Sequence, residues 1–275
     1  MKINNNIQAL NAYRNLNQNQ FATSKNLEKL SSGLRINRAA DDAAGLAISE
    51  KMRSQIRGLK QAERNALDGV SLIQTAEGAM QEVHSMLQRM RELTVQAAND
   101  TNEVEDRAAI KNELDQLISE ISSIAEKTEF NNKKVLSGGA MTTPGIDFQI
   151  GPNSNQKVTL TIKKMDAATL LIPIADILVT TNATANISIT KIDTAIKTVS
   201  EERSKLGAIQ NRLEHTINNL QTTHENLTAA ESRIRDADMA LEMTEFTRNN
   251  ILNQAGTAML AQANQLPQGV LQLLQ

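Results

Sequence analysis

The most informative absences in this 275-residue chain are those of cysteine and of long apolar runs. Without cysteine the chain can form no disulfide, no thiolate metal site and no cysteine nucleophile. It has no apolar run of about 18 residues, the length of a membrane-spanning helix, so we expect no membrane insertion. A net charge of -2 favours no nucleic-acid partner. These absences exclude several classes of enzyme, membrane protein and nucleic-acid-binding protein.

Proline is also scarce, and its positions divide the chain. Pro144, Pro152 and Pro173 lie close together, no proline precedes them, and only Pro267 follows. Because proline disrupts helices, this central segment should differ from the stretches on either side. Within it, two runs of alternating apolar and polar residues flank a polar loop, which predicts a β-hairpin. The apolar residues of these runs are Ile146, Phe148 and Ile150, then Val158, Leu160 and Ile162.

What the sequence does contain is a long heptad repeat. Aliphatic residues recur at every seventh position from Ile192 to Leu241, which predicts one gently supercoiled helix. Such a helix spans roughly 75 Å, so the molecule should be a rod. Its apolar stripe is narrow and needs partner helices, which helical patterns in the first half of the chain supply. We expect the buried seam to contain Val199, Leu206, Leu213, Leu220, Leu227 and Ile234.

The predicted fold class is therefore mainly α, a long helical coiled-coil rod or bundle with a small β-hairpin cap. We divide it into three parts. Residues 1–40 and 243–275 form a terminal coiled coil with its linker, residues 41–138 and 190–242 form the helical rod, and residues 139–189 form the hairpin and an irregular cap.

The two ends of the chain are amphipathic but almost uncharged. No acidic residue precedes Glu28, and the 27 residues after Arg248 carry no charge. A single amphipathic helix buries little surface in water, so we expect these ends to stay disordered until a partner covers them. Uncharged copies can crowd together without desolvating ions, which indicates a polymer joined through its chain ends. We assign this polymerisation to Ile3, Ile7, Leu10, Leu252, Met259, Leu266 and Leu273.

Three stretches of the first hundred residues carry a family resemblance. They read LSSGLRINRAADDAAGLAISEKMRSQIRGL (30–59), DGVSLIQTAEGAM (68–80) and QRMRELTVQAAND (88–100). With these motifs the chain closely resembles bacterial flagellin, over roughly residues 1–138 and 190–275. The resemblance implies a structural subunit, not an enzyme and without cofactors, that polymerises into the extracellular flagellar filament used for swimming. The short middle segment implies that the large outer domains of longer flagellins are absent.

The resemblance also implies partners beyond the homopolymer. The subunit would leave the cell unfolded through the flagellar type III export apparatus, with an export chaperone and without a cleaved signal peptide. Filament cap and hook-junction proteins would contact it during assembly. Recognition by the animal innate receptor Toll-like receptor five would involve Arg89, Leu93 and Glu113. A packed leucine beside a solvated arginine on one helical turn is the plainer interpretation of the first two residues.

Two alternatives to a filament subunit stay open. A hook-filament junction protein belongs to a related structural class but caps a polymer instead of extending it. A membrane-active helical module needs cationic amphipathic faces, whereas the ends of this chain are nearly neutral. None of His84, His215 and His224 lies in a metal-binding HExxH pattern, so we expect no metal site.

Overall fold

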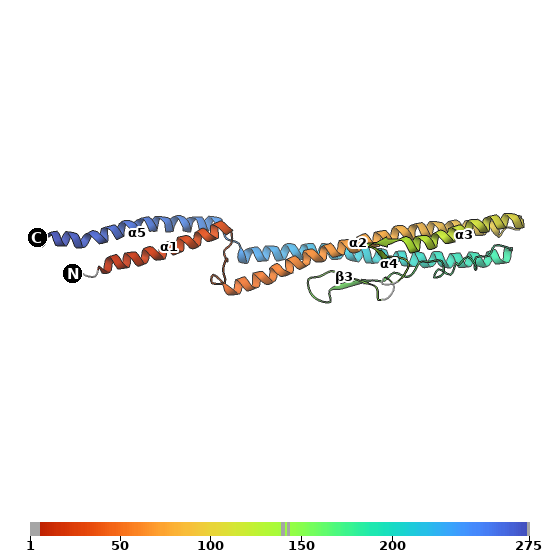
Figure 1. Ribbon diagram of the computed structural model, residues 1–275, viewed down its shortest axis with the longest axis horizontal. Coiled ribbons are helices and arrows are strands. Elements are labelled where there is room, and N and C mark those ends of the chain that lie inside the picture. Colours follow the sequence, from red (N-terminus) through yellow and green to blue (C-terminus); the bar gives the residue numbers. More distant parts are fainter. Residues whose placement is uncertain (1–5, 139–140, 142–143, 274–275) are drawn as a thin grey trace. The chain divides into compact units, whose positions relative to one another are not determined.

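The computed structural model describes residues 6–138, 141 and 144–273, which are mainly helical (Figure 1). The predicted fold class is confirmed, because long helices accompany a small antiparallel hairpin. The predicted polymerisation residue Ile3 lies outside the described residues. The elements are α1 (Ile7–Ser32), α2 (Ala43–Ala97), α3 (Val104–Lys127), β1 (Glu129–Phe130), β2 (Lys133–Lys134), β3 (Ile146–Gln149), β4 (Lys157–Leu160), α4 (Asn182–Arg235) and α5 (Met239–Leu273).

The chain divides into two compact units. One combines Met1–Ile56 with Glu225–Gln275, and we call it the terminal unit. The other is Arg57–His224, and we call it the central unit. The three-part division made from the sequence stays a prediction.

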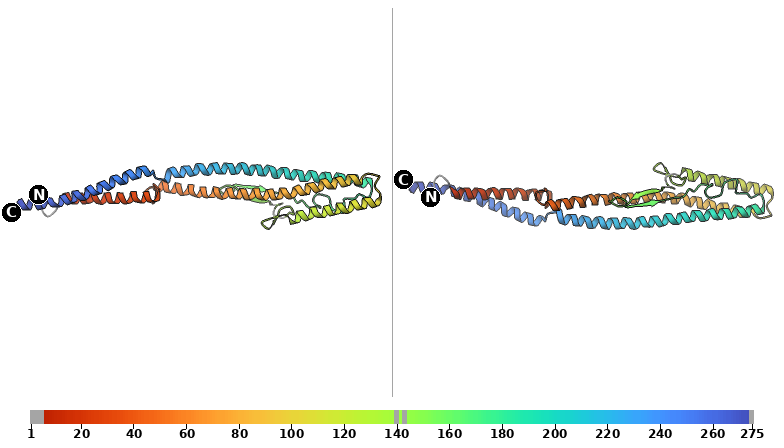
Figure 2. Two further views of the ribbon diagram at one scale, coloured as in Figure 1. Left: turned by 90° about the horizontal axis from the view of Figure 1, so that it is seen from above. Right: turned by 90° about the horizontal axis from the view of Figure 1, so that it is seen from below.

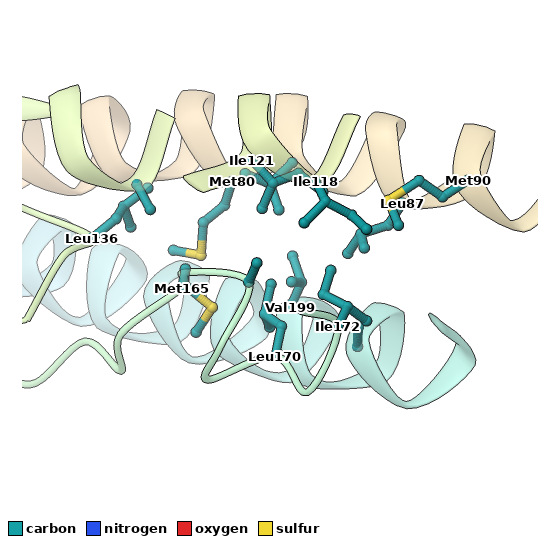
Figure 3. Close-up of a cluster of buried hydrophobic side chains, with 14 of the residues drawn as sticks. Met80, Leu87, Met90, Ile118, Ile121, Leu136, Met165, Leu170, Ile172 and Val199 are labelled. Atoms are coloured by element: carbon teal, nitrogen blue, oxygen red, sulfur yellow. The ribbon is translucent and has the colours of Figure 1, made fainter. Parts of the chain in front are cut away.

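The central unit has one hydrophobic core, to which three helices and the segments between them contribute. Figure 3 shows side chains from α2, α3 and α4 pointing into the same interior. The regular spacing of apolar residues on each helix produces this arrangement, because residues three and four apart share a helix face. Fully buried examples are Met80, Leu87 and Met90 of α2, Leu114 and Ile121 of α3, and Ile192 and Val199 of α4.

The irregular segment between β4 and α4 contributes more to this core than its sequence pattern predicted. Its apolar residues do not follow a helical or strand period, yet most of them are buried. Backbone hydrogen bonds fix the segment at two points, from Ile162 N–H to Met141 O (2.9 Å) and from Met165 N–H to Leu136 O (2.9 Å). The buried residues that follow include Leu170, Ile172, Ile177 and Val179.

Two antiparallel strand pairs accompany the helices. The predicted hairpin is confirmed as β3 and β4, with Ile146 opposite Leu160 and Gln149 opposite Lys157. The pair β1 and β2 was not expected from the sequence. Its turn is Asn131–Asn132, where both residues have positive φ (49° and 61°), as a two-residue hairpin turn of type I′ requires.

The prediction of one continuous helix from Ile192 to Leu241 is wrong at its C-terminal end. Helix α4 ends at Arg235 and α5 begins at Met239. The backbone between them pairs with the segment after α1, since Arg35 N–H donates to Arg235 O (2.7 Å) and Ala237 N–H donates to the carbonyl oxygen of Gly33 (2.9 Å). The heptad period continues across this break, so periodicity could not reveal it.

Helix α4 also begins earlier than the sequence pattern indicated, at Asn182 instead of near residue 190. Thr181 starts it, because its carbonyl oxygen accepts the first helical hydrogen bond from Ala185 N–H (2.9 Å). Its hydroxyl oxygen accepts from Thr184 N–H (3.3 Å), which is the arrangement of a threonine N-cap. The threonine-rich and alanine-rich composition of this region hid the helix start.

Candidate assembly surface

The terminal unit pairs the two ends of the chain as helices α1 and α5. Both helices have clear local starts, since the side-chain oxygen of Asn6 accepts from Ala9 N–H (3.1 Å) and that of Asp238 accepts from Ala240 N–H (2.9 Å). Helix α1 ends at Ser32 and is capped by Gly33, whose positive φ of 72° is the conformation that favours glycine at a helix C-terminus. Many Cα atoms of the two helices lie within 8 Å of each other, and Figure 2 shows them side by side in two further views.

The two helices run antiparallel, and polar contacts join them at three steps. Near the start of α1, Asn6 Nδ2 donates to Ala263 O (2.7 Å). Further along, Asn253 Nδ2 donates to Thr23 Oγ1 (2.8 Å). Near the end of α1, Lys29 Nζ forms an ion pair with Glu242 Oε1 (2.6 Å). Polar contacts therefore occur along most of the length of the pair.

The apolar part of this contact is small. Leu16 is the large apolar side chain of α1 that is buried, and it packs against Gly256 of α5. A Cβ atom at position 256 would lie 3.2 Å from Leu16 Cδ1, so glycine allows the close approach of the two helices. Among the side chains of α5 that the structure describes, Ala263 is the buried apolar one, whereas Glu242 and Asn249 are buried polar ones.

Most of the large apolar side chains on α1 and α5 stay exposed to solvent. Phe21 is 82% exposed and Leu10 is 61% exposed. A shallow groove also runs over the pair, and its lining residues are Gln8, Asn11, Ala12, Asn15, Gly256, Met259, Gln262 and Ala263. Large exposed apolar patches on protein surfaces are typical of sites that interact with other macromolecules. We call the exposed apolar side chains of these two helices the assembly surface; they are Ile7, Leu10, Tyr13, Phe21 and Leu27 of α1 and Met239, Leu241, Met243, Ile251, Leu252 and Met259 of α5.

The predicted polymerisation residues have different places in this surface. Ile7, Leu10, Leu252 and Met259 are exposed on it. Leu266 and Leu273 lie in α5, with side chains outside the described part of the chain. The sequence analysis placed both ends in one terminal coiled coil but expected them to stay disordered until a partner covers them, whereas the structure shows α1 and α5 paired as helices within one chain. It also missed the inward-facing polar residues, because polar side chains on a helix usually face solvent.

The short segment between α1 and α2 is anchored at both ends. Asp41 forms an ion pair with Lys25 of α1 (2.8 Å) and accepts hydrogen bonds from the backbone N–H groups of Arg38 (3.1 Å) and Asn37 (3.2 Å). The hydrogen bond from Lys25 and those from the backbone lower the pKa of Asp41 from 3.8 to about 2. Asp42 then caps α2, because its side chain accepts from Gly45 N–H (2.8 Å).

The residues predicted for the helical seam are buried to different degrees. Those in the central unit are buried, whereas Leu227 and Ile234, which belong to the terminal unit, are half-buried. Their predicted role in a rod core stays a prediction. The buried members are Val199, Leu206, Leu213 and Leu220.

The three residues predicted to contact a receptor are not equally accessible. Arg89 and Glu113 are exposed and form an ion pair between α2 and α3 (3.0 Å), and Glu113 raises the pKa of Arg89. Leu93 is only 3% exposed and belongs to the hydrophobic core. A partner that binds here would therefore contact the ion pair directly, and Leu93 would support the helix from beneath.

The described residues contain neither a metal-binding cluster nor a membrane-spanning helix. Within residues 6–138, 141 and 144–273, no three histidine, aspartate or glutamate side chains gather closely enough to hold a metal ion. No helix in the described part of the chain combines the length and the apolar character that crossing a bilayer requires.

The chain combines long helices with a small hairpin and a helix pair whose apolar side chains are exposed. These features are typical of helical subunits that assemble into larger structures. Comparison with known proteins identifies the family. The model of the bacterial flagellin N-terminal helical region matches residues 3–140, and that of the C-terminal helical region matches residues 189–274. The chain therefore belongs to the bacterial flagellin family.

Full-length relatives agree with this assignment. The chain is 58% identical to a flagellin of Halalkalibacterium halodurans and 54% identical to a flagellin of Bacillus subtilis, and each alignment covers 100% of both chains. A crystal structure of Bacillus cereus flagellin shares 35% identity, with 61% of this chain and 94% of that chain covered and a TM-score of 0.49.

These relatives define the general function. The chain is a structural subunit of the flagellar filament, an extracellular assembly, and not an enzyme. The alternative of a hook-filament junction protein is not favoured, because the full-length relatives are flagellins.

Proposed function

We propose that copies of this chain join into the filament through the assembly surface on α1 and α5. The observation that carries the proposal is the exposure of large apolar side chains on these paired helices. Burying a leucine or phenylalanine side chain contributes about 1.5–3 kcal/mol, so several of them can hold a neighbouring copy. No charge follows Arg248 in the sequence, so helix α5 packs in a polymer without desolvating ions along that stretch.

A single charge placed in this surface tests the proposal. In the full-length chain, Phe21→Asp puts a carboxylate at an 82% exposed position of α1. We expect this variant to lose elongation of filament seeds, because assembly would bury the carboxylate without a partner. Gln74→Asp, at an exposed position of α2, is the charge-matched control and should elongate normally. Light scattering measures elongation, and the fluorescence of the single tyrosine, Tyr13 of α1, reports on the surface itself.

Normal elongation by the Phe21→Asp variant would contradict the proposal. If Phe21→Asp elongates seeds as fast as the unsubstituted chain, α1 does not contact neighbouring copies through this face. Circular dichroism of both variants separates a loss of elongation from misfolding, and neither substitution lies in the core of the central unit.

We further propose that the subunit is exported unfolded through the flagellar type III apparatus, with an export chaperone and without a cleaved signal peptide, and assembles with cap and hook-junction proteins. Two features support this route. The chain has no cysteine and therefore no covalent cross-link, and the α1–α5 pair buries little apolar surface, so it opens readily. In the isolated subunit, amide hydrogens of α1 and α5 should exchange faster than those of α2 in the core. Equal protection would contradict ready opening.

Recognition by Toll-like receptor five is a separate proposal, supported by the exposed ion pair of Arg89 and Glu113. Substitution of Arg89 by alanine should weaken activation of the receptor by the isolated subunit. Arg91→Ala is the matched control, because Arg91 is exposed on the same helix and pairs with Asp193 instead. Equal activation by the two variants would remove Arg89 from the contact.

A further inference from the structure

The polar contacts between α1 and α5 are placed where an apolar seam would normally lie. Thr23 contacts Asn253, and Lys29 contacts Glu242, along the line on which Leu16 packs against Gly256. In paired helices, a polar residue inside the contact selects the register at a cost in stability, because a shifted arrangement leaves it without its partner. An apolar seam of similar residues distinguishes less well between registers.

The unsatisfied atoms in this contact indicate that it is not built for maximum stability. Asn26 Nδ2, Asn253 Oδ1 and Glu242 Oε2 are buried without a hydrogen-bond partner in the described part of the chain. Each such atom costs free energy that an apolar side chain of similar shape would not cost. Polar residues are therefore retained here at the expense of stability.

A shift of one heptad shows what these residues prevent. Shifting α5 by seven residues in one direction would place Leu260 opposite Thr23 and Asn249 opposite Lys29. The opposite shift would place Phe246 opposite Thr23, and Lys29 would lie beyond the first residue of α5, with no residue of this helix opposite it. Both shifts break the ion pair and the hydrogen bond.

Packing alone does not prevent such a shift. The position seven residues after Gly256 is Ala263, another small residue on the side of α5 that faces α1. Leu16 could therefore pack over either position with little change in shape. The difference between the two registers therefore comes from the polar contacts, together with the backbone pairing of Gly33 and Arg35 with Ala237 and Arg235 next to the ends of the two helices.

We infer that Thr23–Asn253 and Lys29–Glu242 set the register of α1 against α5, so that each subunit presents one fixed arrangement of its assembly surface. This inference concerns the pair within one chain and does not depend on whether the proposed polymer contact is correct. Thr23, Lys29, Glu242 and Asn253 are thus specificity-determining residues for the pairing of the two ends.

Engineered cysteines can measure the register directly, because the chain contains no cysteine of its own. A Cβ at position 256 would lie 3.8 Å from the Leu16 Cβ, close to the mean of about 3.8 Å in disulfides. The pair Leu16→Cys and Gly256→Cys therefore reports the observed register. The pair Leu16→Cys and Ala263→Cys reports the register shifted by one heptad. Each pair is placed in the full chain, and the dilute subunit is oxidised and analysed for intramolecular disulfide.

The test variant replaces the four polar residues by apolar ones, with Thr23→Val, Lys29→Met, Glu242→Leu and Asn253→Leu. A matched control makes comparable changes at three exposed positions and one half-buried position outside these contacts, with Ser24→Val, Arg248→Met and Asn250→Leu at the exposed positions and Glu245→Leu at the half-buried one. In the unsubstituted background and in the control, the observed-register disulfide should exceed the shifted one by about tenfold or more, which corresponds to about 1.4 kcal/mol between registers. In the test variant the two yields should become similar.

Two results would overturn the inference. One is a test variant that keeps the preference of the control, since the register would then come from packing or from the backbone pairing of Gly33 and Arg35 with Ala237 and Arg235. The other is a test variant that forms neither disulfide while the control forms the expected one, since the polar contacts would then hold the helices together without choosing between registers. Circular dichroism of the helices accompanies each measurement.

Discussion

The two compact units of this chain differ in how many of their large apolar side chains are buried. The central unit buries large side chains from three helices and the irregular segment in one core, whereas α1 and α5 bury one large apolar side chain, Leu16, among their described residues. Large apolar residues are not rare on α1 and α5, but most of them face solvent. The central unit therefore buries its apolar side chains within one chain, whereas most of the large apolar side chains of α1 and α5 in the terminal unit stay exposed.

This difference separates two requirements on a filament subunit. A part that must be stable before assembly needs a core that is complete in one chain. A part that becomes stable on assembly needs apolar surface that neighbours complete, together with contacts that keep this surface in one arrangement. The same residue type, leucine, consequently has different roles in the two units.

Matched leucine substitutions should give the largest effect. Leu114 of α3 is fully buried in the central core, so Leu114→Ala should lower the free energy of unfolding of the isolated subunit by about 2–5 kcal/mol. Leu10→Ala, at an exposed position of α1, should change it by no more than about 0.5 kcal/mol. Urea unfolding followed by circular dichroism measures both. Similar losses in the two variants would remove the contrast between the units.

For assembly, we expect the substitution at the exposed Leu10 to have the larger effect. Leu10→Ala removes apolar surface that we propose a neighbouring copy covers, so it should raise the critical concentration for filament growth roughly tenfold, equivalent to about 1.4 kcal/mol. Gln20→Ala, an exposed polar position on the same helix, is the control. Sedimentation of filaments from a concentration series measures the critical concentration. An unchanged value for Leu10→Ala would place the polymer contact elsewhere.

Substitution of two glycines of α2 tests how closely this helix is packed in the central unit. A Cβ at Gly78 meets no atom within 4 Å, so Gly78→Ala should raise the free energy of unfolding by about 0.5–1 kcal/mol through helix propensity. A Cβ at Gly58 would lie 2.8 Å from Pro152 Cβ and 3.2 Å from Pro152 Cα. Gly58→Ala should therefore show none of this gain. An equal gain in both variants would mean that the β3–β4 loop moves away from α2 freely.

Much of the fold could be predicted from the sequence because its elements are long and strongly periodic. The helices, the β3–β4 hairpin and the capping role of Asp42 all follow from local patterns. The break between α4 and α5 could not, because the heptad continues through it and the cause lies in the backbone pairing with Gly33 and Arg35. The burial of the irregular segment depends on long-range packing, which has no local pattern.

The candidate site was predictable to a similar degree. The apolar residues of the two ends stand out by their spacing, and the described ones among them, Ile7, Leu10, Leu252 and Met259, are exposed. The direction in which α1 faces α5 was not predictable, because polar residues such as Thr23 and Asn253 usually lie on the solvent side of a helix. Their contact across 230 residues of sequence exists only in the folded chain.

The smallest expected effect is an acid sensitivity of the segment between α1 and α2. Because the pKa of Asp41 is about 2 in the folded chain and 3.8 in its ordinary state, the stabilisation from its ionised form is complete above about pH 4 and is lost as the pH falls towards 2. The backbone N–H groups of Asn37 and Arg38 donate to this carboxylate, so their protection from hydrogen exchange should fall over the same range. Asp41→Asn should remove the pH dependence, and its protection should be low at neutral pH. Protection that stays constant from pH 5 to pH 2 in the unsubstituted chain would show that Asp41 does not hold this segment in place.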